Sequence, residues 1–272
     1  SKQQEEIAVY DFQVLTQNQW FPRAFNDWRF VLLVMIGSLA IFPDLGNATI
    51  LFLVALLMYS ISGIAHRWFA TILGVLTSLS FVSLTTIKLV GVDKFSKIPV
   101  FGYVAKRFSA FFNPFDDVAG AGHQLANSYY AMVNGGWFGL GLGNSIEKRG
   151  YLPEAHTDFV FSIVIEEFGF VGASLILALL FFLILRIILV GVRAKDPFNS
   201  MVAIGIGGMI LIQVFVNIGG ISGLIPSTGV TFPFLSQGGN SLLVLSVAIA
   251  FVLNIDASEK RAKLYREYEA QL

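Results

Sequence analysis

Long apolar runs alternate with short polar breaks along the chain. A membrane-spanning helix needs about 20 mostly apolar residues, so these runs predict an all-α, polytopic transmembrane protein with about six spans. The run at 159–192 is longer than one membrane thickness and contains Glu166, Glu167 and Gly169. We expect its first third to lie outside the membrane or at its surface and residues 171–190 to span. The runs occupy residues 30–42, 48–64, 69–89, 159–192, 201–218 and 241–253.

The composition agrees with a membrane protein. Of the 272 residues 55% are hydrophobic and 13% are charged, whereas a soluble domain is nearer a quarter charged. Eighteen Lys and Arg balance eighteen Asp and Glu, so no overall field favours nucleic acid as a partner. The absence of cysteine excludes disulfides and thiolate nucleophiles. The three histidines lack the short spacing of a zinc pair.

The distribution of basic residues predicts the orientation, because short cytoplasmic loops are enriched in Lys and Arg. The breaks at 66–67 and 193–195 and the charged tail should be cytoplasmic. Threading the spans alternately then places Asp44, residues 91–157 and residues 219–240 outside. We expect one membrane domain over residues 1–272. Its parts are a cytoplasmic segment (1–29), three spans (30–90), an outer loop of short helices (91–157), three spans (158–254) and a cytoplasmic tail (255–272).

The outer loop keeps basic residues on the side where the orientation rule gives no reason for them, which would suit an anionic ligand. Arg107 stands before an aromatic stretch at 108–115. An arginine there can hold a phosphate through paired hydrogen bonds, or it can simply anchor an amphipathic segment at the interface. Both interpretations stay open from the residues alone. The six cations are Lys94, Lys97, Lys106, Arg107, Lys148 and Arg149.

Residues 152–158 place two carboxylates, an imidazole and a hydroxyl at the mouth of a span. Glu154 and Asp158 could converge on one ligand or one divalent cation, and either could act as a general base. The alternative is that Thr157 or Asp158 only caps the helix that follows. The glycines at 139–143 match neither the dinucleotide nor the Walker spacing, which argues against a nucleotide site.

Irregular backbone at 218–241 and an acid at Asp44 lie next to apolar runs. Non-helical backbone near a membrane persists only when it is buried in protein or lines a polar cavity, and an acid there is costly unless it is paired or hydrated. The 218–241 segment is therefore either part of a site or a re-entrant loop that packs on its neighbours.

Taken together, seven ordered motifs resemble the SEDS family of bacterial membrane proteins. That family has about ten spans and a large outer loop, and the runs here correspond to the last six spans. The resemblance therefore implies that the chain is the C-terminal two thirds of a longer protein. The motifs are Pro43–Gly46, Arg107 with Phe111–Pro114, Gly122–Gln124, Gly139–Gly143, Tyr151–Phe159, Glu166–Glu167 with Gly169, and Gly223–Gly229 through Pro233–Ser241.

The resemblance implies a peptidoglycan glycosyltransferase that polymerises lipid II into glycan strands during septal wall synthesis. Asp158 matches the family's essential acid and would deprotonate the acceptor hydroxyl. Arg107, with Lys148 or a divalent cation (Mg²⁺ or Mn²⁺) at Glu154 and Asp158, would stabilise the pyrophosphate. The candidate substrate-binding residues are Asp44, Arg107, Lys148, Glu154, His156, Thr157, Ser236, Gly238, Gly239 and Ser241.

The resemblance also implies lipid II, a class B penicillin-binding transpeptidase and other membrane proteins of the divisome as partners. The expected location is the bacterial plasma membrane at the division septum, with the catalytic face outside the cytoplasm. Three alternatives stay open: an elongation-type polymerase, a lipid II flippase and a scaffold that only binds partners. A flippase requires a polar path open to both membrane faces, whereas the predicted topology keeps the loop charges on the outer side.

Overall fold

The computed structural model describes residues 45–61, 74, 78, 85, 107–120, 122–269 and 271. The chain divides into two compact units, Ser1–Leu51 and Phe52–Leu272. Throughout the described ranges the regular structure is helical, with no strand, as the apolar pattern predicts. The predicted span at 30–42 lies outside these residues, and so does the one at 69–89 apart from residues 74, 78 and 85.

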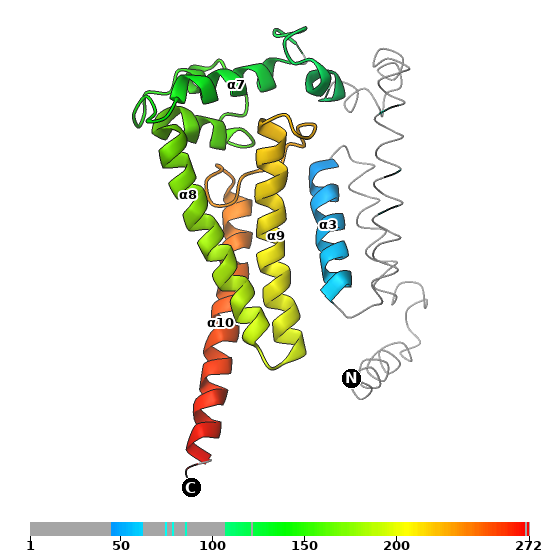
Figure 1. Cartoon of the computed structure of the whole chain (residues 1–272), viewed down its shortest axis with the longest axis vertical. Helices are drawn as coiled ribbons and strands as arrows, with labels where there is room; N and C mark the ends of the chain where they lie inside the picture. Colours follow the sequence, from blue (N-terminus) through cyan, green and yellow to red (C-terminus); the bar gives the residue numbers. More distant parts are fainter. Residues whose placement is uncertain are drawn as a thin grey trace. The chain divides into compact units, whose positions relative to one another are not determined.

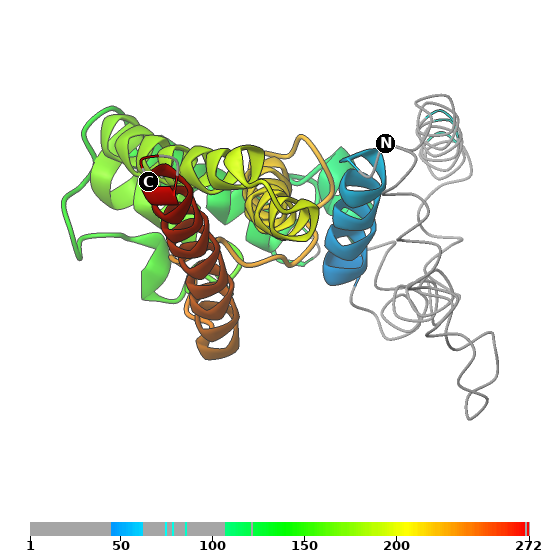
Figure 2. The same cartoon turned by 90° about the horizontal axis from the view of Figure 1, so that it is seen from below.

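Three long apolar helices form the membrane part of the larger unit. They are α8 (Val160–Arg193), α9 (Pro197–Ile221) and α10 (Gly239–Glu269), each long and apolar enough to cross a membrane. The three pack against one another, and they can be followed from below in Figure 2. The shorter apolar helix α3 covers Leu45–Ile61. These helices correspond to four of the predicted spans.

Local chemistry sets where α9 begins and where α8 bends. Asp196 accepts a hydrogen bond from Phe198 N at 3.2 Å and Pro197 follows it at the first helical position, an N-terminus that these residue types favour. Helix α8 is broken at Gly169, whose φ is 71°. The break divides α8 into a short piece before Gly169 and a long piece after it, close to where the 159–192 run is predicted to divide, while the outer position of the first piece stays a prediction.

A glycine-rich loop wraps the break in α8. The amides of Leu140 and Gly141 donate to the carbonyls of Glu166 and Glu167, both at 2.9 Å, and Phe170 N donates to Gly136 O at 2.9 Å. The loop therefore satisfies backbone groups that a continuous helix would have paired internally. Gly139 is the glycine of this loop that the close backbone contact requires, because a Cβ there would meet the carbonyl of Glu167.

Helix α7 (His123–Gly135) lies across the ends of α8 and α9 (Figure 1). Ser128 Oγ and Ser162 Oγ are 2.7 Å apart, and Ser128 Oγ also donates to Ile221 O at 3.3 Å. One buried hydroxyl thus connects three helices at this end. A 3₁₀ turn, η1 (Glu147–Arg149), and the segment between α9 and α10 lie at the same end, as expected for the two segments predicted to share the outer side.

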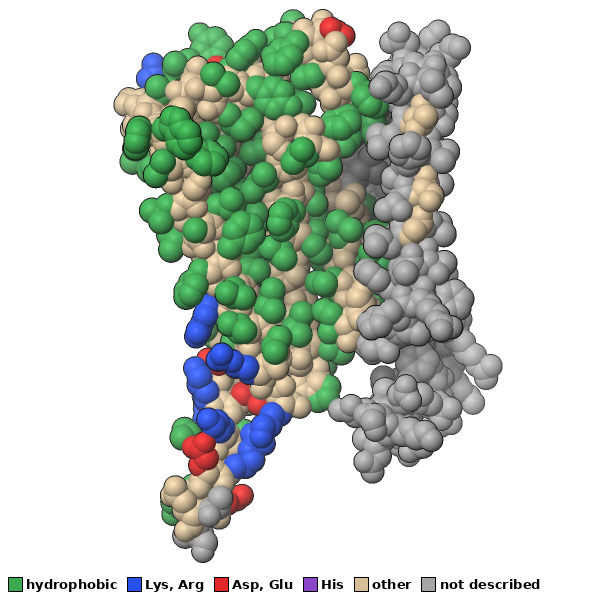
Figure 3. Space-filling view, viewed as in Figure 1, with side chains coloured by type: hydrophobic (Ala, Val, Ile, Leu, Met, Phe, Trp, Pro, Cys, Tyr) green, Lys and Arg blue, Asp and Glu red, His purple; other side chains and the backbone are tan. Residues whose placement is uncertain are grey.

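The surface of α8, α9 and α10 is apolar along most of its length (Figure 3). Leu175, Leu179, Phe182 and Leu243 are each more than 60% exposed, and lipid tails are the natural solvent for such a surface. Charged side chains gather over the lower part of α10, which continues beyond the turn between α8 and α9.

Candidate active site

Asp158 lies in a tight turn immediately before α8. The carbonyl of Glu154 accepts hydrogen bonds from Thr157 N at 3.1 Å and Phe159 N at 3.2 Å, and Glu154 itself has a φ of 56°, a conformation uncommon for a residue other than glycine. The N-cap of α8 is Phe159, and no side chain caps the helix. The interpretation of Thr157 or Asp158 as the cap of α8 is therefore wrong. The amides of Thr157 and Phe159 close this turn on the carbonyl of Glu154, and the helix begins only after Phe159.

The backbone around Asp158 is held from outside its own turn. Three consecutive carbonyls, those of residues 156–158, accept hydrogen bonds from α9 and from the segment that follows it. These bonds fix the position of the turn relative to α9. The donors are Gln237 N to His156 O (2.7 Å), Ser236 Oγ to Thr157 O (2.6 Å) and Asn217 Nδ2 to Asp158 O (2.7 Å).

Arg107 and Asp158 meet at Gly229. The guanidinium of Arg107 donates to the carbonyl of Ser227. A Cβ built on Gly229 would lie 3.0 Å from Arg107 Nη2 and 3.3 Å from Asp158 Oδ2. The absence of a side chain at this residue therefore leaves room for a cation and an acid beside the same backbone atom. The two residues predicted to act on one substrate are brought together.

A small recess borders this point. It is lined by Asp158, Phe159, Asn217 and residues 220–221 and 227–230, and it has room for roughly one water molecule. The recess lies between the Asp158 turn, α9 and the segment after α9, and hydrogen bonds from Asn217 join these three parts. A hydroxyl group placed here would lie next to the acid.

The other predicted residues of the turn have their own partners. Thr157 Oγ1 donates to Glu154 Oε2 at 2.6 Å, so the Glu154 carboxylate is engaged within the turn. The side chain of His156 is exposed. Among the described residues no group of three His, Asp or Glu side chains is arranged to hold a metal.

The remaining predicted residues fall into three places. Ser236 Oγ accepts from Phe232 N at 2.7 Å while it donates to Thr157 O, which makes it a support of the turn. Gly239 and Ser241 lie in the first turn of α10, and Gly238 directly precedes it. Asp44 lies outside the described residues.

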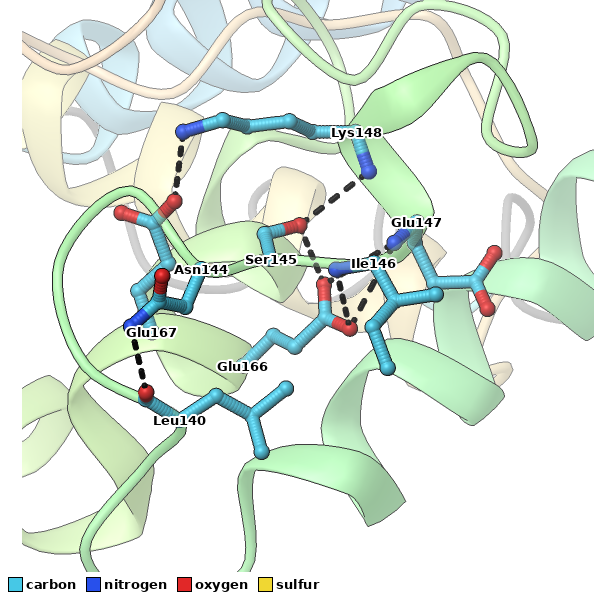
Figure 4. Close-up of polar contacts among 8 residues, drawn as sticks. All are labelled: Leu140, Asn144, Ser145, Ile146, Glu147, Lys148, Glu166 and Glu167. Carbon is cyan, nitrogen blue, oxygen red and sulfur yellow. Dashed lines mark hydrogen bonds and ion pairs between the residues drawn. The ribbon is translucent and has the colours of Figure 1, made fainter.

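Lys148 contributes to a separate buried network between η1 and α8 (Figure 4). Its ammonium pairs with Glu167 Oε1 at 2.6 Å. The neighbouring Glu166 is fully buried and accepts from Ser145 Oγ at 2.5 Å and Ile146 N at 3.1 Å. A buried carboxylate needs several donors to offset its lost hydration, and the loop at 145–147 supplies them. The network anchors the loop that precedes the Asp158 turn.

Glu147 is the least well paired acid of this network. It is 7% exposed, and its Oε2 has no hydrogen-bond partner among the residues the structure describes. Burial raises the pKa of Glu147 above its ordinary value, the charge of Glu166 raises it further, and His123 partly opposes the shift. Glu147 therefore favours its protonated form more than an exposed glutamate does.

The sequence reasoning missed two amide side chains on α9 that support the segment after it. Gln213 and Asn217 are four residues apart on α9 and both donate to the segment after it; Gln213 Nε2 reaches Thr231 O at 3.0 Å. Their signal was present in the sequence, since amide side chains inside an apolar span are costly unless they are paired. Their spacing puts them on one face of the helix.

Comparisons with known proteins show the family of the chain. The FtsW/RodA/SpoVE family of cell cycle proteins matches residues 13–261. The chain belongs to the FtsW/RodA/SpoVE family. It is 52% identical over 265 residues to a Lactococcus lactis protein named probable peptidoglycan glycosyltransferase FtsW, a match that covers 97% of this chain and 63% of the relative. The same name is carried by a Bacillus subtilis relative that is 40% identical over 87% of this chain and 58% of its own length.

Solved structures of the FtsW/RodA/SpoVE type have the same fold. One, from a study of how a peptidoglycan synthase complex coordinates polymerization and crosslinking, matches with a TM-score of 0.63 and 25% identity, over 85% of this chain and 61% of the other. A crystal structure of an aspartate-to-alanine mutant of the Thermus thermophilus Rod shape determining protein RodA matches with a TM-score of 0.54 and 23% identity, over 91% and 62%. The chain thus spans somewhat less than two thirds of several of its relatives, and it is a multi-pass membrane protein.

Proposed function

We propose that this chain carries the catalytic site of a peptidoglycan glycosyltransferase that polymerises lipid II during cell division. The relatives named FtsW support the activity and the division role. The observation that carries the proposal is the meeting of Arg107 and Asp158 at Gly229. Acid and cation are the two groups that glycosyl transfer from a lipid pyrophosphate needs.

In the proposed reaction Asp158 removes the proton from the 4-hydroxyl of the acceptor GlcNAc. The resulting oxygen attacks the anomeric carbon of the donor MurNAc with inversion. The bond from that carbon to the pyrophosphate oxygen breaks, and undecaprenyl pyrophosphate leaves with the bonding electrons. Arg107 stabilises the negative charge that develops on the leaving phosphate, where a preorganised donor is most effective.

A divalent cation is a weaker part of the proposal. The Glu154 carboxylate already accepts from Thr157, and the described part of the chain holds no cluster of three potential ligands. The described residues therefore offer no preformed metal site at Glu154 and Asp158. The steps above are written for Asp158 and Arg107 alone.

The first test is lipid II polymerisation by the purified full-length protein carrying Asp158→Asn. The amide has nearly the same shape but cannot accept the proton, so we expect the rate to fall by about 100- to 10,000-fold. Thermal unfolding of the variant should match that of the wild type. A wild-type rate would overturn Asp158 as the base.

Arg107→Ala tests the second role. We expect about a 100-fold loss of rate, since one donor to the developing charge is removed, and Arg107→Lys should recover part of it. The matched control is Arg149→Ala, which removes an exposed cation of the same outer region. Equal, small losses for Arg107→Ala and Arg149→Ala would mean that Arg107 only anchors the interface.

We further propose that the site works on the outer face of the plasma membrane at the division septum, beside a class B penicillin-binding transpeptidase and other divisome membrane proteins. A structural neighbour comes from a peptidoglycan synthase complex that couples polymerization to crosslinking, which supports a synthase partner. Co-purification of the full-length protein with a tagged transpeptidase from the same cells tests this pairing.

A further inference from the structure

Asn217 is a buried amide in an apolar helix. It is 3% exposed, and its Nδ2 donates to two carbonyls at once, Asp158 O at 2.7 Å and Val230 O at 2.6 Å. Only the nitrogen of the amide can donate to a carbonyl, so these two partners fix which way the side chain faces. The amide is therefore a bridge between the turn before α8 and the segment after α9.

The two bridged segments carry the two sides of the site. Asp158 belongs to the first, while the second, residues 227–230, contains Gly229 and the carbonyl to which Arg107 donates. Asn217 thus controls how far the acid lies from the segment that holds the cation. A base must be correctly placed to a few tenths of an ångström, because small misplacements lower rates strongly.

The oxygen of the Asn217 amide argues against a role in packing alone. Asn217 Oδ1 is buried and has no hydrogen-bond partner among the described residues. An unsatisfied buried oxygen lowers stability, and a leucine of similar volume would fill the same space without that cost. Asn217 also lines the recess beside Asp158. The contribution of this side chain is therefore the pair of hydrogen bonds that its Nδ2 donates to the two segments.

We propose that Asn217 is a positioning residue for the Asp158 base, holding its backbone at the distance from Arg107 that the transfer reaction needs. The inference rests on the proposed glycosyltransferase function. Asn217 is not itself in contact with the reacting atoms; it acts through Asp158. Single Asn217 variants should therefore turn over more slowly, and combining such a variant with Asp158→Asn should cause no further loss.

The experiment measures lipid II polymerisation and lipid II binding by the full-length protein. Asn217→Leu and Asn217→Ser should each lower the turnover rate by about 10- to 100-fold, with the dissociation constant for lipid II changed less than threefold. Rates are expressed per lipid II-binding protein, so partial misfolding does not count as lost catalysis. If the leucine variant does not fold, the serine variant makes the same test.

The matched control is Gln213→Leu. Gln213 is an amide one turn away on α9, and its Nε2 donates to Thr231 of the same segment rather than to the Asp158 turn. We expect its removal to lower stability while the turnover rate per folded protein stays within threefold of the wild type. Equal rate losses for the Gln213 and Asn217 variants would show that Asn217 only supports the segment after α9, which would overturn the proposal.

The deciding readout is the double variant Asn217→Leu with Asp158→Asn. If Asn217 acts through the base, the double variant should be no slower than Asp158→Asn alone. A further 10-fold or larger loss in the double variant would overturn the proposal. Failure of the proposed function looks different: the wild type would not polymerise lipid II, or Asp158→Asn would work at the wild-type rate.

Discussion

Gly229 shows how one missing side chain can organise a site. Its φ is 77°, and a Cβ there would lie 3.0 Å from Arg107 Nη2 and 3.3 Å from Asp158 Oδ2. The left-handed conformation thus favours glycine here. A side chain at this residue would also press on the guanidinium and the carboxylate, so the bare backbone gives both groups room beside it.

Gly229→Ala should consequently harm activity more than stability. The left-handed conformation costs alanine about 1 kcal/mol, and the methyl group also pushes on both charged side chains. We expect the lipid II polymerisation rate to fall at least tenfold. The control is Gly143→Ala, at a φ of 84° with no atom within 4 Å of its Cβ, which meets the same strain without the collision. Similar activity in the two variants would contradict the role of Gly229.

Glu147 gives a second prediction at the scale of a residue. Its pKa in the folded protein is raised above the ordinary value of 4.5 by burial and by Glu166, so the folded state holds this proton after the unfolded state has released it. Its contribution to stability is greatest at pH values below about 4.5 and is lost as pH rises through the folded pKa. Glu147→Gln removes this titration.

We therefore expect the melting temperature of Glu147→Gln, relative to the wild type, to increase as pH is raised from about 4.5 to 7. Thermal unfolding of the detergent-solubilised protein over this range measures the difference. The slope with pH is the readout, since the new amide shifts both ends of the curve equally. A difference that does not change with pH would show that Glu147 titrates normally.

Among the elements, the break in α8 is the place where the glycine-rich loop contacts this helix. A Cβ on Gly169 would collide with the backbone of Trp137 and Gly139, and one on Gly139 would collide with the carbonyl of Glu167. The two segments touch through bare backbone, and this contact holds the loop that carries the Glu166 and Lys148 network.

Gly169→Ala should separate the loop from α8. The left-handed φ and the collision together cost about 2 to 4 kcal/mol, so we expect a melting temperature several degrees lower and faster proteolysis between residues 136 and 150. Gly143→Ala again controls for strain alone. Unchanged protection of the loop in Gly169→Ala would mean that the contact does not hold it.

The elements themselves could be predicted from the sequence, and the contacts between them could not. Apolar runs predict α8 almost to the residue, since the run at 159–192 corresponds to Val160–Arg193, and Gly169 within that run indicated a division. The pairing of Asn217 with the carbonyl of Asp158 depends on which turn of α9 lies beside which loop, and no local pattern encodes that. The family resemblance singled out Asp158 and Arg107 but not the amide that connects their supports.

At the scale of the molecule, the basic turn between α8 and α9 and the proposed site lie at opposite ends of the spans. The Asp158 turn, α7 and the segment after α9 are at one end, and the turn between α8 and α9, with Arg193 and Lys195, is at the other. Because short cytoplasmic loops are enriched in Lys and Arg, this arrangement supports the proposal that the site works on the outer face.

Cysteine labelling tests this orientation cleanly, because the chain has no cysteine and any introduced thiol is the only one it carries. Tyr151 is 60% exposed near the site, and Lys195 is exposed in the turn after α8. We expect Tyr151→Cys to react with a membrane-impermeant maleimide in intact cells from which the outer barrier has been removed. Lys195→Cys should react only after the membrane is permeabilised. The reverse pattern would put the site inside the cell, where it could not add to a wall built outside, and would refute the proposed function.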